Sequence, residues 1–258
     1  MSTRPHGAPA LRLPTFDDFT TSLRLGLRDF VSVPLVDLFF ASFFVISGLF
    51  MAWITYLTGQ TFWMILLVMG FPLVGTLSAL GFYETSRRRQ QGAEIGFGNV
   101  VAHVWDQKGG QLPWLAAIIV VIFMFWFFLG HMIFALFLGL SPMTNVSTSL
   151  GVFVEPDGLM MLGFGTLVGG VFALLIFSIS VLGIPMLLDR DIDFITAMLR
   201  SVSAVQASPM LFLLWGLLIG VVTLLSMVPL FLGLFVTMPV LGHATWHLYH
   251  RLLVEPDT

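Results

Sequence analysis

The sequence predicts an all-α integral membrane protein, with six transmembrane helices in three repeated units of an amphipathic interfacial helix followed by a transmembrane hairpin. Three observations support this fold class. Of the 258 residues, 57% are hydrophobic and only 10% are charged. Apolar stretches long enough to cross a bilayer recur along the chain, and all Lys and Arg residues fall in alternate loops. A soluble domain has about 25% charged residues, so this chain carries too few charges to cover a water-facing surface.

The spans follow from length, because a transmembrane helix needs roughly 20 mostly apolar residues. The predicted spans are residues 34–56, 62–83, 113–140, 159–188, 209–227 and 230–249. They form a single membrane domain over residues 15–251. We expect residues 1–14 to be a disordered N-terminus and residues 252–258 to be a tail.

The orientation follows from the basic residues, which accumulate in cytoplasmic loops. All eleven Lys and Arg residues lie in the N-terminal segment, in the loops after the second and fourth spans, or in the tail. The opposite side carries Glu155 and Asp157 and no basic residue. The pattern therefore predicts that both termini are cytoplasmic.

An internal repeat is predicted from the segments that precede each pair of spans. In the first segment, apolar residues at helical spacing are Phe19, Leu23, Leu27 and Phe30. Similar stripes follow Phe97 and Phe194, and each stripe predicts a helix lying along the membrane surface. Thr15 and Asp193 are the expected N-caps of the first and third of these helices. The predicted units are about residues 15–86, 93–188 and 190–251; the alternative is that apolar-rich sequence aligns with itself by chance.

His131 is the candidate cofactor-binding residue, because it lies deep in the third predicted span. A histidine there can ligate haem or a metal, or relay a proton. A single histidine without an intramembrane partner fits better with a neutral side chain that makes one hydrogen bond. No cofactor is therefore predicted.

His243 and His247 are the candidate metal ligands, since two histidines four residues apart on a helix can share a metal ion. No third ligand is evident nearby, so an interfacial role at the end of the sixth span is preferred. Asp37, one turn inside the first span, is interpreted as structural, with Arg28 or water within its reach.

Arg87, Arg88 and Arg89 directly follow the second predicted span. They are candidate ligands for anionic lipid headgroups, at roughly 1 kcal/mol per charge, and they also anchor the topology. Two GxxxG spacings, which begin at Gly165 and Gly216, predict close helix packing. The chain has no cysteine, Walker loop, HExxH or GxSxG motif, so no catalytic constellation is recognised.

The stretch Gly26-Leu-Arg-Asp-Phe30, four residues before Pro34, resembles the start of an uncharacterised family of bacterial integral membrane proteins. The family is known as a domain of unknown function, and some members are labelled putative cytochrome c oxidase subunit. The resemblance extends from about Phe16 to Arg251 and implies the six-span fold and a bacterial inner-membrane location. It brings no established active-site residues. A catalytic oxidase subunit needs several intramembrane histidines, whereas only His131 lies deep in a span here.

Three functions fit the sequence. The first is a non-catalytic accessory or scaffold component of a membrane complex, with a partner on the cytoplasmic face. The second is a transporter or channel for an apolar or lipid-like substrate, for which a laterally open cavity between the hairpins would be evidence. The third is an oxidase-associated redox subunit. The lipid bilayer is the common partner of all three, and no nucleic-acid partner is predicted.

Overall fold

The structure, a computed structural model, describes residues 4–58, 79–139 and 154–254. Its helices are α1 (Phe16–Ser32), α2 (Pro34–Thr58), α4 (Phe97–Asp106), α5 (Leu112–Leu138), α6 (Pro156–Ser180), α7 (Gly183–Asp189), α8 (Phe194–Ala207), α9 (Pro209–Met227) and α10 (Leu234–Leu252). A further helix covers residues 79–90, and a short 3-10 helix, Gln107–Gly109, follows α4. The predicted all-α fold class is therefore confirmed for the described residues.

Four helices in the described ranges are long and apolar enough to cross a membrane. They are α2, α5, α9 and the segment Pro156–Asp189, which joins α6 to α7. Most of the second predicted span lies outside the described residues. The sixth corresponds to α10, which is not among the four. Six spans and the threefold repeat thus stay predictions.

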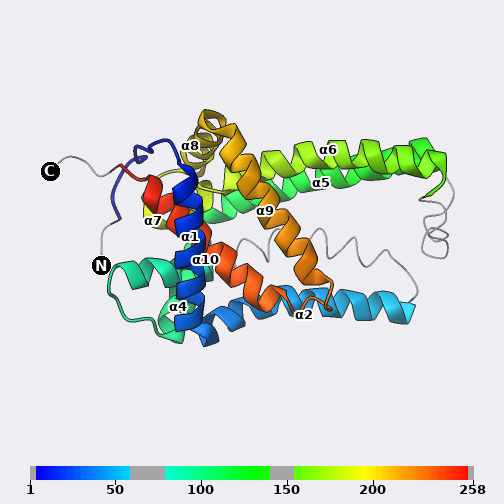
Figure 1. Cartoon of the computed structure of the whole chain (residues 1–258). Helices are drawn as coiled ribbons and strands as arrows, with labels where there is room; N and C mark the ends of the chain where they lie inside the picture. Colours follow the sequence, from blue (N-terminus) through cyan, green and yellow to red (C-terminus); the bar gives the residue numbers. More distant parts are fainter. Residues whose placement is uncertain (1–3, 59–78, 140–153, 255–258) are drawn as a thin grey trace.

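The helices separate into two groups in space (Figure 1). The shorter helices α1, α4, α7 and α8 gather at the end of the molecule where both termini lie, whereas α2 and the α5–α6 pair extend away from it. We call this the terminal end. α1 runs across the ends of the long helices instead of continuing them.

Among the described helices, α1 and α10 form the most extensive contact. A Cβ atom on Gly26 would lie 2.5 Å from the backbone oxygen of Val240 and 2.7 Å from the backbone nitrogen of Ala244. Only a glycine lets the two backbones approach so closely, because any larger residue would require one helix to move. α10 is correspondingly buried along much of its length.

Several of the side chains that α1 and α8 bury are small or polar. On α1 the buried residues are Asp18, Phe19, Ser22, Gly26 and Asp29, and on α8 they are Ala197, Ser201 and Val205. Leu27, which belongs to the predicted apolar stripe of α1, is 52% exposed. The buried faces of α1 and α8 therefore depend on close packing and hydrogen bonding as well as on apolar contacts.

The N-terminal segment has defined partners where the sequence predicts disorder. The backbone nitrogen of Arg12 donates to the carbonyl of Leu252 at 2.9 Å, and Val254 donates to the carbonyl of Ala10 at 3.0 Å. These two hydrogen bonds attach the segment before α1 to the end of α10, so the two ends of the chain stabilise each other.

Candidate functional site

A chain of hydrogen-bonded polar side chains passes through the interior of the terminal end. It connects four helices, α1, α2, α10 and the helix over residues 79–90. We call it the polar chain, and its members in order are Asp37, His243, Ser86, Asp29, His247, Gln90 and Trp246. Its residues are up to 218 positions apart in sequence.

The first half of the polar chain connects α2 with α10 and α1. Asp37 Oδ2 lies 3.0 Å from His243 Nε2, and His243 Nδ1 lies 2.8 Å from Ser86 Oγ. Ser86 Oγ in turn donates to Asp29 Oδ2 at 2.7 Å. All four side chains are 0% exposed, so each of these groups depends on its partners in the protein.

The second half leads from Asp29 toward the surface. His247 Nε2 lies 2.7 Å from Asp29 Oδ2, and its Nδ1 lies 3.0 Å from the amide nitrogen of Gln90. Trp246 Nε1 donates to the amide oxygen of Gln90 at 2.9 Å. Gln90 is exposed, so the polar chain reaches from solvent to the fully buried Asp37.

Asp29 is the charged centre of the polar chain. Arg89 Nε lies 3.2 Å from Asp29 Oδ1. Burial acts to raise the pKa of Asp29, but the hydrogen bonds from His247 and Ser86 outweigh it and hold the pKa below its ordinary value. Asp29 is therefore an ionised carboxylate at neutral pH.

The two candidate metal ligands face different carboxylates. His243 contacts Asp37, whereas His247, one turn later, contacts Asp29. Among the residues that the structure describes, no group of three His, Cys, Asp or Glu side chains is arranged to hold a metal ion. The four-residue spacing thus places each histidine against a different carboxylate, in two separate histidine–carboxylate pairs.

The three consecutive arginines also meet carboxylates of their own chain. Arg87 Nε and Arg88 Nε lie 2.7 Å and 2.6 Å from the carboxylate of Glu84, which is 0% exposed. Arg89 contacts Asp29, as described above. Their role as lipid ligands stays a prediction, and the observed contacts attach the segment after residue 86 to the buried acids.

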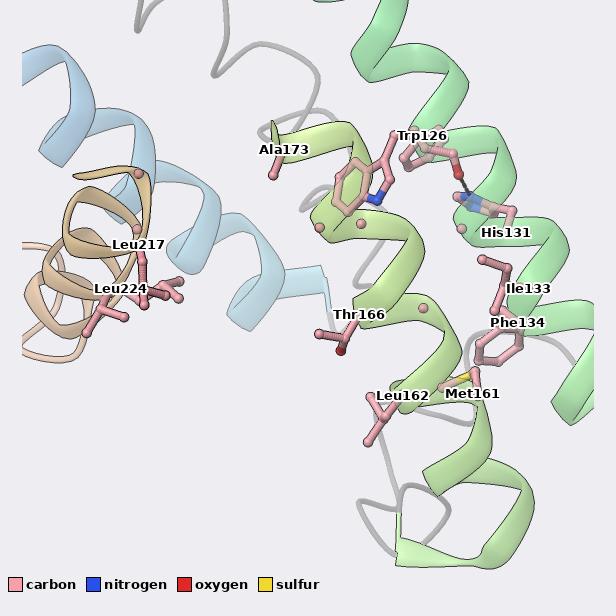
Figure 2. Close-up of a pocket in the computed structure, with 18 residues that line it drawn as sticks. Trp126, His131, Ile133, Phe134, Met161, Leu162, Thr166, Ala173, Leu217 and Leu224 are labelled. Carbon is pink, nitrogen blue, oxygen red and sulfur yellow. Dashed lines mark hydrogen bonds between the residues drawn. The ribbon is translucent and has the colours of Figure 1, made fainter. Parts of the chain in front are cut away.

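An apolar cavity of about 870 Å³ lies between α5, α6 and α9. Figure 2 shows its walls, with Trp126 and His131 on α5, Thr166 on α6, and Leu217 and Leu224 on α9. Six glycines contribute to the lining: Gly130, Gly165, Gly169, Gly170, Gly216 and Gly220. The remaining lining is predominantly hydrocarbon.

The glycines of the two GxxxG spacings behave differently. A Cβ on Gly169 would lie 3.1 Å from Trp126 Nε1, and one on Gly216 would lie 3.4 Å from the ring of Phe177. A Cβ on Gly165 or Gly220 would meet nothing within 4 Å. All four glycines border the cavity, and one glycine of each pair also packs against an aromatic side chain.

His131 lies on the wall of this cavity, away from the polar chain. Its Nδ1 is 2.9 Å from the carbonyl oxygen of Phe127, one turn earlier on α5. Because a carbonyl only accepts, Nδ1 carries a hydrogen and donates it. This leaves Nε2 of His131 as the nitrogen that can meet a ligand.

Sequence reasoning did not identify Asp29 and Ser86 as site residues. It also expected Arg28 or water near Asp37, where the structure places His243. One signal for Asp29 was present, since it belongs to the Gly26–Phe30 motif and lies three residues after Gly26 on the close-packed face of α1. Nothing in the local sequence of Ser86 distinguishes it from other serines at the ends of spans.

The comparison with protein families confirms the resemblance that the sequence suggested, over part of the chain. Residues 63–189 match the family described as Predicted integral membrane protein (DUF2189). This match includes α5, α6 and the helix over residues 79–90, and it excludes the Gly26–Phe30 motif. No curated protein and no solved structure matches the chain. With four apolar helices long enough to span a bilayer, the chain is an integral membrane protein whose residues 63–189 match the uncharacterised DUF2189 family.

Proposed function

We propose that this protein binds and transports an apolar or lipid-like molecule, and that the cavity between α5, α6 and α9 is its binding site. The cavity is the single observation that carries the proposal. It distinguishes this function from the scaffold and redox hypotheses, neither of which requires a large apolar pocket. The proposed setting is a bacterial inner membrane with both termini cytoplasmic, which places the terminal end at the cytoplasmic surface.

The size and chemistry of the cavity support a small amphipathic ligand. Ligand pockets in proteins typically measure about 300–1,000 Å³ and combine apolar walls with a few polar groups. This cavity, at about 870 Å³, lies in that range. Its polar side chains are those of Trp126, His131 and Thr166. A hydrocarbon chain would contact the glycine and leucine walls, and a polar head would contact His131 Nε2.

Filling the cavity tests this function directly. A leucine at Gly165 or Gly220 has room for its Cβ and would extend into the space that the ligand needs. Gly163→Leu is the matched control, because it is also on α6, also has an unobstructed Cβ, and does not line the cavity. The readouts are the lipids that co-purify with the protein, measured by mass spectrometry, and transfer of a fluorescent fatty acid in proteoliposomes.

We expect Gly165→Leu and Gly220→Leu to lose both the co-purified lipid and the transfer, and Gly163→Leu to retain both. Equal behaviour of all three variants and the wild type would contradict the proposal.

A second candidate function is an accessory component of a membrane complex. It is favoured by the spans α5 and α9, in which only 17% of the most apolar window is buried within the chain. Such helices present long surfaces to lipid or to a partner helix. Purification in a gentle detergent with mass spectrometry tests this function, and recovery of the isolated protein alone would count against it. The redox hypothesis would be rejected by an optical spectrum without a haem band together with a metal analysis that finds no bound metal.

A further inference from the structure

We propose that the Asp37–His243 pair is a proton-binding site, which holds one proton between Asp37 Oδ2 and His243 Nε2. The inference goes beyond the proposed transport function and does not depend on the cavity. It rests on the direction of each hydrogen bond along the polar chain. These directions can be assigned one after another, starting from a group that can act only as a hydrogen-bond donor.

That group is the indole of Trp246, which can donate but cannot accept. Its partner on Gln90 must therefore be the amide oxygen, at 2.9 Å. The amide nitrogen of Gln90 then faces His247 Nδ1 at 3.0 Å and donates to it. Nδ1 of His247 thus carries no hydrogen, so His247 is neutral and its Nε2–H donates to Asp29.

The direction of both hydrogen bonds of Ser86 follows from the charge of Asp29. Asp29 is ionised, so it accepts from His247 Nε2 and from Ser86 Oγ, and Arg89 balances its charge. A serine has one hydroxyl hydrogen, and Ser86 gives it to Asp29. The contact of 2.8 Å between Ser86 Oγ and His243 Nδ1 must then be donated by the histidine. Nδ1 of His243 therefore carries a hydrogen.

With the hydrogen of His243 on Nδ1, the contact between Asp37 and His243 Nε2 lacks the hydrogen that a hydrogen bond needs. With Asp37 ionised and His243 neutral, a carboxylate lone pair would face the lone pair of Nε2 at 3.0 Å in a site with 0% exposure. One added proton converts the repulsion into a hydrogen bond, either from a protonated Asp37 or from an imidazolium. In both forms the pair with its proton is electrically neutral.

The surroundings favour the bound proton. Asp37 Oδ1 is buried and has no hydrogen-bond partner, which costs more for a carboxylate oxygen than for the carbonyl oxygen of a carboxylic acid. The titratable and charged groups nearby are Asp29 on α1, Glu84 and Arg89 on the helix over residues 79–90, and His247 on α10. Glu84 is paired with Arg87 and Arg88, and Asp29 with Arg89. Loss of the proton would therefore leave Asp37 as a fully buried carboxylate whose contacting partner, His243, is a neutral imidazole.

Release of this proton would act on the contact between two helices. The proton would pass to water, leaving Asp37 as a carboxylate on α2 and His243 as a neutral imidazole on α10. The two would then repel each other, and the contact between the N-terminal turn of α2 and the middle of α10 would weaken. The polar chain provides hydrogen-bonding groups from this site to Gln90 at the surface.

The direct test is ¹⁵N NMR of histidine in the full-length protein in nanodiscs, with His243→Asn and His247→Asn used to assign the signals. At neutral pH we expect Nδ1 of His243 to be protonated and Nδ1 of His247 to be unprotonated. An unprotonated Nδ1 on His243 would overturn the proposal, because Ser86 would then donate to His243 and no proton would be missing from the Asp37 contact.

A pair of variants provides a second, independent test by thermal unfolding. Asn at position 37 can donate its amide hydrogen to Nε2 of His243 without a titrating proton. Raising the pH from about 6 to about 9, beyond the ordinary histidine pKa of about 6.5, should lower the Tm of the wild type by roughly 5 °C more than that of Asp37→Asn. Glu94→Gln, an exposed carboxyl on a loop, is the control and should follow the wild type. Parallel pH profiles for all three proteins would contradict the proposal.

Discussion

Glycine has opposite structural roles beside the polar chain and beside the apolar cavity. At Gly26 a missing side chain brings two helix backbones together, and the buried acids and histidines around that crossing are nearly all paired. At Gly165 and Gly220 the missing side chain leaves open space. The comparison shows that a glycine-rich membrane sequence can contain both a close-packed junction and a cavity, and that spacing alone does not distinguish them.

The two regions also differ in how they respond to change. In the polar region each side chain has partners on other helices, so removing one leaves another buried group unpaired. In the cavity region the lining groups are apolar and border empty space, so added volume meets little resistance. Substitutions should therefore affect stability strongly in the first region and mainly ligand binding in the second.

Gly26→Val should have the largest effect on stability. A Cβ at this position would lie 2.5 Å from a backbone oxygen of α10, which no rotamer change can relieve. Overpacking of this kind costs about 1–3 kcal/mol and more where backbone must move, so we expect a loss of about 3 kcal/mol or more. Thermal unfolding in detergent measures it. Gly98→Val on exposed α4, where a Cβ meets nothing, is the control, and equal losses for both would show that the α1–α10 crossing is not tight.

Ser86→Ala should have the next largest effect, because Ser86 joins the two carboxylate–histidine pairs. Its loss leaves His243 Nδ1 without an acceptor and removes one donor from Asp29. An unpaired buried polar group costs about 1–3 kcal/mol, and this range is the expected loss of stability on unfolding. Ser203→Ala, whose hydroxyl bonds only to its own helix, should be nearly neutral. A neutral Ser86→Ala would mean that the polar chain is not continuous at this point.

Much of the architecture could be predicted from sequence because it depends on averages along the chain. Hydropathy over about 20 residues identifies α2, α5, α6 with α7, and α9, and proline at the start of α2 and α9 marks their first residue. These signals are local and additive. They also predicted the short amphipathic helices α1, α4 and α8.

The candidate sites could not be predicted in the same way, because they depend on single contacts between distant residues. His247 meets Asp29 across 218 positions and His243 meets Asp37 across 206, which no local pattern encodes. The three arginines were identified from their charge, but their partners Glu84 and Asp29 depend on how the helices pack. Likewise, the cavity depends on the relative positions of α5, α6 and α9.

The pH dependence of stability in acid should reveal a smaller contribution from Asp18. This carboxylate is 1% exposed, and the hydrogen bonds from Arg12 at 2.6 Å and 2.8 Å, with those from Thr15, hold its pKa well below its ordinary value. A lowered pKa stabilises the folded state above the ordinary Asp pKa of about 3.9, and this stabilisation is lost as the pH falls below it. The Tm of the wild type should therefore fall more steeply than that of Asp18→Asn between about pH 4 and about pH 2. Asp17→Asn, an exposed neighbour, is the control and should follow the wild type.

The smallest predicted effect separates the two kinds of glycine within the cavity region itself. In a helix, Gly→Ala at a position with room for a methyl group stabilises by about 0.4–1 kcal/mol, because the unfolded chain loses conformational freedom. Gly165→Ala meets nothing within 4 Å and should show this gain. Gly169→Ala, one turn later on the same helix, places its methyl group 3.1 Å from Trp126 Nε1 and should show no gain or a small loss. Thermal unfolding of the two variants side by side measures the difference, and an equal gain at both positions would mean that Trp126 moves aside and that the cavity wall is softer than its geometry indicates.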